Sequence, residues 1–334
     1  RKKKPFLFFA NNSKTLIVAD TIAKYYAINI VTGDLLWSKN HVTPFNSQIK
    51  IYKDKFFVVD FENVLRCYSI KDGTEIWKFK TEKSIIKSQK KLSVVLINDK
   101  VYFSNSIGDI SAIDIETGNL IWQTPTQATT VYENSFLLKR PPLIAGPKTC
   151  LFESCDNEFF SLDISYGTIN WKQNINSTLR PTLIDQLIFT ITMEGFLVVI
   201  DNNNGNIIRI TDIFDRFNKK KRSKIKPEGF IVGNKNIYLT TSNGRLLIIN
   251  ILSGKTEEIL KIDRERISRP FVLNQNLFII KNNAINILEK WKGSKMVLTI
   301  ENITICFYYT SLTGYLSSNI ATSYYRNITH NSFV

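Results

Sequence analysis

Along most of the chain, short runs of apolar residues alternate with turn-forming residues. In residues 111–114 the apolar alternation has a period of two, which is typical of a strand that buries one face. A further apolar run, such as residues 100–104, lies upstream of each strand of this kind. Nothing in the pattern calls for a helix, so the sequence predicts an all-β protein.

One strand–turn–strand unit recurs along the chain, and its copies align on a glycine with a tryptophan four residues later. Four copies contain both residues, at positions 26–37, 67–77, 111–122 and 160–171. Two further copies keep the glycine and lose the tryptophan, at positions 197–209 and 246–258. Residues 273–288 form a seventh, partial copy that has two strands but no clear turn glycine.

The spacing of the copies identifies the architecture. Successive turn glycines are 38 to 49 residues apart, counted from their positions, close to the roughly 40–50 residues of a four-stranded β-propeller blade. The blade anchors are Gly33, Gly73, Gly118, Gly167, Gly205 and Gly254, with Trp37, Trp77, Trp122 and Trp171. The sequence therefore predicts a β-propeller with six clear blades and one partial blade, and seven or eight blades in the intact protein.

Each part of the repeated unit has a physical reason. The glycine supplies the positive φ that the turn between two strands requires. Four residues earlier, a short Asp or Asn side chain can accept hydrogen bonds from turn amides. These residues are Asn29, Asp114, Asp163, Asp201 and Asn250. The tryptophan then lies on the outer strand, where we expect its ring to pack against the neighbouring blade.

The repeat ends near residue 289. Residues 1–289 are therefore predicted to form the propeller, and residues 290–334 a tail outside the repeat. The tail has β-branched residues and tyrosine but no anchor turn. It fits either a closing strand followed by a disordered end or an unrelated addition. Because the chain starts at Arg1 and not at methionine, we expect a truncated N-terminus.

Composition supports a folded chain with a diffuse positive charge. Hydrophobic residues make up 43% of the sequence, enough for a substantial core, and the net charge is +15. The lysines are spread over most loops, which favours a general attraction to acidic surfaces over a nucleic-acid-binding face. The basic run at residues 219–226 is interpreted as a solvated loop, because only Phe214 and Phe217 could stack bases near it.

Residues that would carry catalysis or hold a metal are sparse. The four cysteines show neither a metal-ligand spacing nor a disulfide framework, and the two histidines are His41 and His330. No phosphate-binding glycine loop is present, and capping explains the aspartates of the turns. The sequence therefore predicts no enzyme activity, no cofactor and no metal. No apolar stretch reaches the roughly 18 residues that span a bilayer.

The motif formed by Ala112, Asp114, Gly118 and Trp122 resembles the PQQ-like propeller repeat. The resemblance covers residues 16–288. Within that superfamily the chain is most similar to the BamB family of outer-membrane protein assembly lipoproteins.

Two loops carry the resemblance to this family. Residues 171–181 are similar to the family's loop after a blade tryptophan, in which a Leu-Arg pair leads into the next strand. Residues 211–229 are similar in position to the family's extended loop one blade later. In the family these loops contact the periplasmic POTRA domain of the barrel-inserting subunit. The resemblance thus implies four partner-binding candidates, of which the first two are the stronger: Leu179, Arg180, Asp215 and Arg216.

The function that this resemblance implies is a non-enzymatic scaffold of the outer-membrane β-barrel assembly machinery. It would be monomeric within a complex, at the inner face of the outer membrane, and would bind no nucleic acid. Membrane association would come only through a lipid anchor that this chain lacks. The family also normally has eight blades, more than are counted here.

Two other classes of propeller compete with this reading. PQQ-dependent dehydrogenases share the blade, but they hold calcium and a quinone, often beneath two adjacent cysteines, and this chain has no adjacent cysteine pair. A general protein-interaction propeller is the other alternative.

Overall fold

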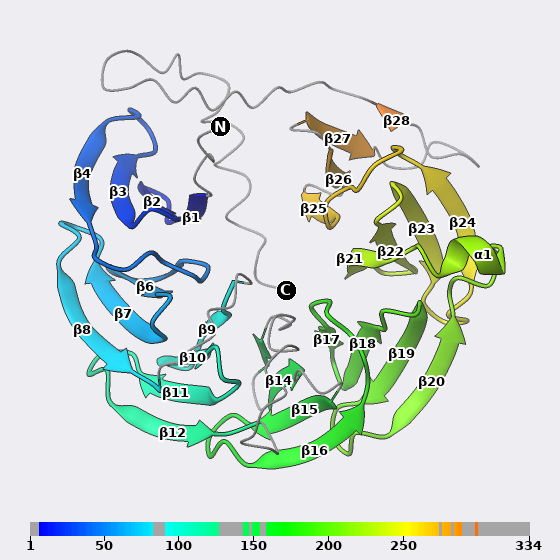
Figure 1. Cartoon of the computed structure of the whole chain (residues 1–334), viewed down its shortest axis with the longest axis horizontal. Coiled ribbons are helices and arrows are strands. Elements are labelled where there is room, and N and C mark those ends of the chain that lie inside the picture. Colours follow the sequence, from blue (N-terminus) through cyan, green and yellow to red (C-terminus); the bar gives the residue numbers. More distant parts are fainter. Residues whose placement is uncertain are drawn as a thin grey trace. The chain divides into compact units, whose positions relative to one another are not determined.

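Nearly all of the regular secondary structure in the described residues consists of strands (Figure 1). It is a computed structural model that describes residues 7–82, 91–126, 143–146, 149–153, 158–273, 276–281, 284–288 and 298–299. Within these ranges the chain forms seven four-stranded antiparallel sheets and one short helix, α1 (Lys219–Arg222). It divides into two compact units, unit 1 up to Asn174 and unit 2 from Ile175 onward. The predicted all-β class is confirmed.

Unit 1 contains four sheets, and in each the strands pair in the order of the sequence. The first sheet consists of β1 (Leu7–Asn11), β2 (Thr15–Asp20), β3 (Lys24–Asn29) and β4 (Leu35–Asn40). The second consists of β5 (Lys50–Tyr52), β6 (Lys55–Val59), β7 (Val64–Ser69) and β8 (Glu75–Lys80). The third consists of β9 (Val94–Ile97), β10 (Lys100–Ser104), β11 (Ile110–Asp114) and β12 (Leu120–Thr124). The fourth consists of β13 (Ile144–Ala145), β14 (Thr149–Glu153), β15 (Glu158–Asp163) and β16 (Ile169–Asn174).

Unit 2 contains three sheets of the same construction. The fifth sheet consists of β17 (Thr182–Ile184), β18 (Leu187–Ile191), β19 (Phe196–Asp201) and β20 (Ile207–Asp212). The sixth consists of β21 (Pro227–Val232), β22 (Asn236–Thr241), β23 (Arg245–Asn250) and β24 (Thr256–Lys261). The seventh consists of β25 (Phe271–Leu273), β26 (Asn276–Lys281), β27 (Ala284–Leu288) and β28 (Leu298–Thr299).

The seventh sheet contains the repeat copy that the sequence supports only in part. Residues 273–288 supply β26 and β27, and β27 pairs antiparallel with β28 in the register Leu288↔Leu298. The sheet thus has four strands, although the repeat copy at residues 273–288 contains no glycine. Its fourth strand, β28, falls within the predicted tail, and the rest of residues 290–334 lies outside the described residues.

The turn between the third and fourth strand has the same construction in the first six sheets. The pairing register shifts beside each turn, for example between Ala112 and Ile113 in β11. The six anchor glycines have φ between +67° and +78°, as expected for this turn. The amide of Gly118 donates to the carbonyl of Asp114, and the other five glycines repeat this bond. The repeated sequence therefore encodes one repeated turn.

Short Asp and Asn side chains close these turns. Oδ1 of Asp114 accepts hydrogen bonds from the amides of Glu116 at 3.0 Å and Thr117 at 2.8 Å. Asn29, Asp163 and Asn250 do the same in their turns, and Asp201 accepts from the amide of Asn203. The bonds from the Thr117 amide and hydroxyl favour the charged carboxylate and hold the pKa of Asp114 below its usual range.

We expect Asp114→Asn to leave the free energy of unfolding at neutral pH nearly unchanged. In acid, the variant should lose less stability than the unchanged protein. Because the pKa of Asp114 is lowered in the folded protein, its contribution is complete above the unfolded pKa of about 4. The contribution of Asp114 to stability is lost as the pH falls through its lower pKa in the folded protein. Asparagine accepts the same amide bonds without titrating, as Asn29 and Asn250 do. Urea denaturation at neutral pH and at about pH 3 tests this, and equal acid losses in both proteins would contradict it.

In unit 1 the anchor tryptophans join each sheet to the next one along the chain. Each indole Nε1–H donates to a carbonyl three residues before the next turn glycine. The pairs are Trp37–Ile70 at 2.9 Å, Trp77–Ile115 at 3.2 Å and Trp122–Ile164 at 3.2 Å. The rings also cover these glycines, since a Cβ on Gly73 would lie 2.7 Å from Trp37 and one on Gly118 would lie 2.6 Å from Trp77. Each of these glycines thus permits both the turn and the close approach of the ring.

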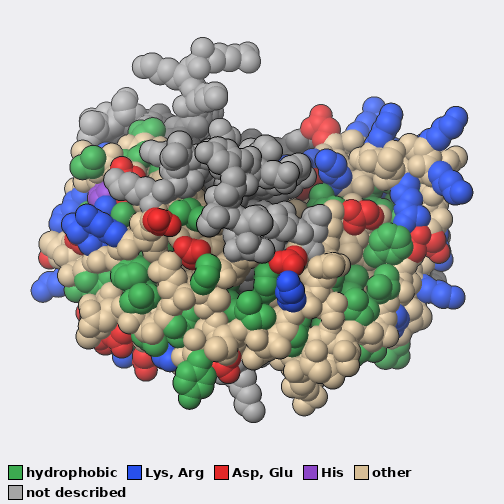
Figure 2. Space-filling view, turned by 60° about the horizontal axis from the view of Figure 1, so that its bottom comes forward, with side chains coloured by type: hydrophobic (Ala, Val, Ile, Leu, Met, Phe, Trp, Pro, Cys, Tyr) green, Lys and Arg blue, Asp and Glu red, His purple; other side chains and the backbone are tan. Residues whose placement is uncertain are grey.

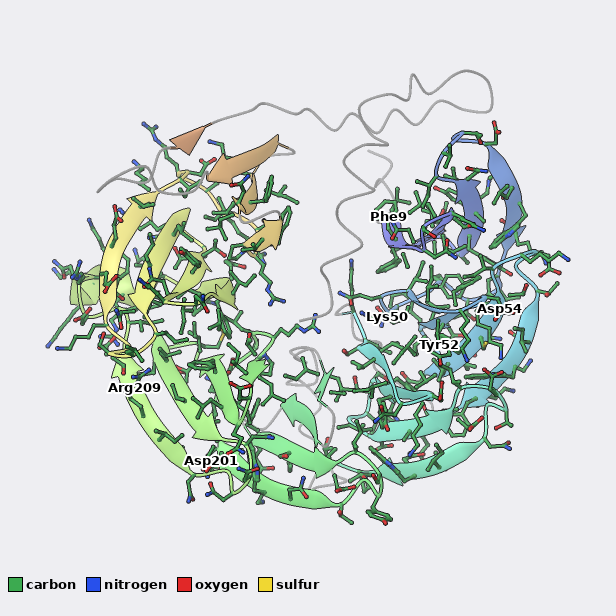
Figure 3. All side chains as sticks on the ribbon, turned by 180° about the vertical axis from the view of Figure 1, so that it is seen from behind. Phe9, Lys50, Tyr52, Asp54, Asp201 and Arg209 are labelled. Carbon is green, nitrogen blue, oxygen red and sulfur yellow. The ribbon has the colours of Figure 1, made fainter. Side chains whose placement is uncertain are left out.

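In the fifth sheet, an arginine takes the place of the missing tryptophan (Figure 3). Nη2 of Arg209 donates to the carbonyl of Ile251 at 2.8 Å, and Nη1 donates to the carbonyl of Leu252. Ile251 lies three residues before Gly254, so its carbonyl corresponds to the one that the tryptophans use. Loss of the tryptophan from this copy therefore does not remove the link to the sixth sheet.

The hydrophobic core lies between successive sheets within each unit. In unit 1, Phe57 and Leu65 of the second sheet share one buried cluster with Val101 and Phe103 of the third. In unit 2, apolar side chains of the fifth and sixth sheets share another: Phe189, Ile191, Leu197, Val199, Phe230, Ile237, Leu239 and Leu247. Stacking of one sheet on the next buries the apolar faces that the alternating pattern predicts.

Candidate partner-binding site

The segment Leu179-Arg180-Pro181 enters β17 and places its first two side chains in different environments. Leu179 is only 6% exposed and belongs to the core cluster shared by the fifth and sixth sheets. Little of its side chain is therefore accessible to a partner. Packing of Leu179 instead fixes the backbone from which Arg180 projects.

Arg180 is an exposed residue, yet the surrounding protein removes enough water from its guanidinium to lower its pKa. The charge of Arg180 acts on a second arginine, Arg269. Loss of water, and secondarily the charge of Arg180, lowers the pKa of Arg269 to about 10. Two like charges thus share a partly desolvated region of unit 2.

A hydrogen bond and close packing hold Arg269 in place. Its Nε donates to the carbonyl of Phe230 at 3.1 Å. Gly229 leaves room for it, because a Cβ at that position would lie 2.5 Å from the Cβ and Cγ of Arg269. Among the described residues, neither Arg180 nor Arg269 forms an ion pair with a carboxylate. The pair can therefore receive an anionic group from another molecule.

Arg269 is a candidate site residue that the sequence pattern did not indicate. A signal for it exists, since Arg180-Pro181 precedes β17 and Arg269-Pro270 precedes β25. The same dipeptide thus stands before the first strand of two sheets. The alignment on the turn glycine did not use this part of the repeat.

The two weaker candidates lie at the start of the connection between β20 and β21. Asp215 and Arg216 are both exposed. Nη1 of Arg216 donates to the carbonyl of Glu257 in β24 at 2.8 Å, which fixes the arginine against the sixth sheet. Within the described part of the chain, no hydrogen bond or ion pair links these residues to Arg180 or Arg269.

Residues with catalytic potential are engaged in structural contacts. Nδ1 of His41 lies 3.1 Å from the amide of Thr43, and its ring stacks on Phe45. Burial raises the pKa of the Cys67 thiol to about 12, which keeps it protonated and unreactive at neutral pH. The side chain of Cys150 is not described, and Cys155, Cys306 and His330 lie outside the described residues.

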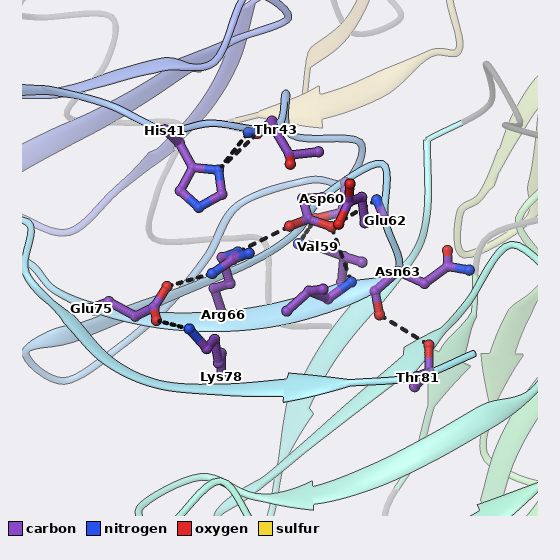
Figure 4. Close-up of polar contacts among 12 residues, drawn as sticks. His41, Thr43, Val59, Asp60, Glu62, Asn63, Arg66, Glu75, Lys78 and Thr81 are labelled. Atoms are coloured by element: carbon purple, nitrogen blue, oxygen red, sulfur yellow. Dashed lines mark hydrogen bonds and ion pairs between the residues drawn. The ribbon is translucent and has the colours of Figure 1, made fainter. Parts of the chain in front are cut away.

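One network of charged side chains in unit 1 has its bonds within a single sheet (Figure 4). Oδ1 of Asp60 accepts from the amides of Glu62 and Val64, and Oδ2 accepts from Nε of Arg66 at 3.0 Å. Arg66 also pairs with Glu75 at 2.6 Å. These contacts close a turn and tie neighbouring strands, so a structural role accounts for the network.

Across the described ranges, no group of three or more His, Cys, Asp or Glu residues is placed to hold a metal ion. In the same ranges, no helix has the length and apolar character to cross a membrane.

Comparison with known sequences identifies the family. The sequence model described as outer membrane protein assembly factor BamB matches residues 7–211, more than half of the chain. A curated relative, the outer membrane protein assembly factor BamB of Legionella pneumophila (strain Paris), is 24% identical over 155 residues. The matched part covers 46% of this chain and 35% of that protein, so it spans about a third of the curated relative.

Comparison with solved structures shows the fold. BamB from Moraxella catarrhalis has a TM-score of 0.68 and 13% identity, and the match covers 90% of this chain and 91% of that one. Quinohemoprotein alcohol dehydrogenase from Comamonas testosteroni has a TM-score of 0.60 and 13% identity, with coverage of 84% and 64%. Likeness at these identities concerns the β-propeller fold alone, which hosts both kinds of protein. The family match, together with the repeated four-stranded sheets, shows that this chain belongs to the family of the outer membrane protein assembly factor BamB.

Proposed function

We propose that the protein is a non-enzymatic scaffold of the outer-membrane β-barrel assembly machinery. It binds a POTRA domain of the barrel-inserting subunit, at the periplasmic side of the outer membrane. Family membership supports the assembly role. The observation that supports the binding site is that Arg180, which belongs to the loop that the resemblance implies, acts electrostatically on Arg269, and that neither forms an ion pair with a carboxylate among the described residues.

The chemistry of the arginine pair indicates what the partner offers. Holding two guanidinium groups together with reduced access to water is unfavourable for both. A carboxylate supplied by a partner would relieve this repulsion and could accept two hydrogen bonds from a guanidinium fork. We therefore propose that acidic side chains of the POTRA domain dock on Arg180 and Arg269, with Asp215 and Arg216 as further contacts.

The test is binding of the purified full chain to isolated POTRA domains, with an Arg180→Glu, Arg269→Glu variant beside it. We expect the variant to bind about a hundredfold more weakly, because reversing charges at a desolvated contact costs several kcal/mol. Affinity of the unchanged protein should fall as salt is raised. Leu179 is left intact, since its substitution would disturb the core.

A matched control is Arg264→Glu, since Arg264 is an exposed arginine of the same unit without an ion pair among the described residues. This control should bind like the unchanged protein, and circular dichroism should show that all three proteins are folded. Unchanged binding by the double variant would refute the proposed site. No binding by any of the proteins would refute the proposed partner.

A further inference from the structure

The connection between β20 and β21 carries a dense group of exposed lysines. We call this group the lysine platform: Lys219, Lys220, Lys221, Lys224 and Lys226. Three of its members lie in α1, which is drawn at the margin of unit 2 in Figure 1. Figure 2 shows Lys and Arg side chains protruding on the same right-hand side of the molecule.

Buried apolar residues anchor the connection that carries the lysine platform. Ile213 and Phe214 are fully buried and Ile225 is 4% exposed, and all three belong to the core cluster of the fifth and sixth sheets. The ring of Phe214 packs edge-to-face on Phe217 with centroids 5.5 Å apart. Apolar side chains on both sides of α1 therefore anchor the connection, and the lysines project from a structured element.

The positive charge of the platform is compensated locally only in small part, since the charge of Lys226 acts on Glu228, which pairs with Arg266. The arginines nearby are engaged: Arg222 pairs with Asp212 at 2.6 Å, and Arg216 donates to a backbone carbonyl. Within the described residues, none of the five lysines takes part in an ion pair. Residues 213–226 contain one acidic residue, Asp215. The basic run of the sequence at residues 219–226 thus carries five exposed lysines without ion pairs among the described residues.

The residues between the lysines indicate the class of partner. The other exposed side chains of the connection are polar or charged, namely Asp215, Arg216, Asn218 and Ser223, while its apolar residues pack in or against the core. A specific protein interface needs a desolvated apolar or aromatic centre, which this surface lacks. Stacking of nucleic-acid bases needs exposed aromatic rings, which the platform also lacks. Mobile ammonium groups on flexible stems suit a surface of many equivalent anionic groups.

We propose that the lysine platform binds the anionic phospholipid headgroups of a membrane surface. The binding is electrostatic and peripheral, so it needs no inserted side chain. Each lysine close to such a surface strengthens binding by about fivefold, and three together by about a hundredfold. Salt weakens this attraction because the Debye length shortens. The proposal concerns residues other than the arginine pair and does not depend on the partner proposed above.

The test is co-sedimentation of the full chain with vesicles of phosphatidylcholine alone or mixed with phosphatidylglycerol. The platform variant Lys219→Gln, Lys220→Gln, Lys221→Gln removes three charges from α1 and keeps good helix formers there. The matched control Lys235→Gln, Lys255→Gln, Lys261→Gln removes three exposed charges elsewhere in unit 2. Both variants retain the basic residues 1–4, so a difference between them reports on the platform.

We expect the unchanged protein and the control to bind the mixed vesicles at low salt, and the platform variant to bind about a hundredfold more weakly. Equal binding by the two variants would assign the effect to net charge and overturn the proposal. Equal binding to both kinds of vesicle would overturn it as well. Binding to polyglutamate is measured in parallel, as a probe for an acidic protein partner. Binding to polyglutamate without binding to vesicles would contradict the proposal.

Discussion

Trp122→Ala is expected to lower the free energy of unfolding by about 3–5 kcal/mol, the usual cost of removing a large buried aromatic ring. The ring of Trp122 is 9% exposed, its Nε1–H donates to the carbonyl of Ile164, and it lies 5.8 Å from the ring of Tyr102. The substitution removes this hydrogen bond and leaves a cavity between the third and fourth sheets. A large loss follows because one side chain supplies packing to two sheets.

Gly167→Ala tests the same contact from the other side. An added Cβ would lie 2.5 Å from Cδ2 of Trp122, and the φ of +73° is strained for alanine by about 1–2 kcal/mol. The strain remains when Trp122 is absent, whereas the collision with the ring does not. Gly167→Ala should therefore cost at least about 1 kcal/mol less in the Trp122→Ala background.

Chemical denaturation of the four proteins of this cycle gives both quantities. Val42→Ala is the control for an exposed apolar residue, since Val42 is 95% exposed, and it should change stability by less than about 0.5 kcal/mol. A change of similar size for Trp122→Ala would show that the indole does not stabilise the stacking of these sheets. Additive effects of Trp122→Ala and Gly167→Ala would show that the two residues do not interact.

Phe214→Ala is expected to cost about 3–5 kcal/mol and to release the connection that carries the lysine platform. Phe214 is completely buried, and its ring lies against Gly195, whose φ is +89°. A side chain at position 195 would collide with the ring. The base of the connection thus depends on one aromatic residue and on the glycine that leaves space for it.

Two measurements separate the local effect from the global one. Denaturation gives the loss of stability, and limited trypsin digestion under native conditions reports on the basic residues 219–222. Cleavage there should become faster in Phe214→Ala than in Leu252→Ala, which alters an exposed residue of the same unit. Unchanged stability together with unchanged cleavage would show that Phe214 does not anchor the connection.

Much of the fold could be predicted because the repeated residues specify a turn through interactions with their neighbours along the chain. Gly118 with Asp114 specifies a turn through backbone φ and amide acceptors, and these depend on neighbouring residues alone. Six copies of that turn were sufficient to predict the propeller. The seventh sheet was predicted only in part, because its repeat copy at residues 273–288 contains no glycine and ends before β28. The pairing of β28 with β27 completes the sheet in the structure.

The partner site was less accessible to sequence reasoning. Leu179 and Arg180 are adjacent, and the sequence treats them alike, whereas the structure buries the first and exposes the second. Arg180 and Arg269 lie 89 positions apart by their residue numbers, and only folding of unit 2 places them together. The spacing of these two residues along the chain does not indicate that they interact in the folded protein.

By itself, the sequence determined the strand class, the repeated turn and the family of this protein, since each depends on short motifs repeated at regular intervals. Only the tertiary structure decided which charges converge. It brought Arg180 and Arg269 into electrostatic interaction, replaced a tryptophan link with Arg209, and buried the apolar residues on either side of the basic run at residues 219–226. The physical reason is that packing and desolvation depend on neighbours in space, which the order of residues along the chain does not reveal.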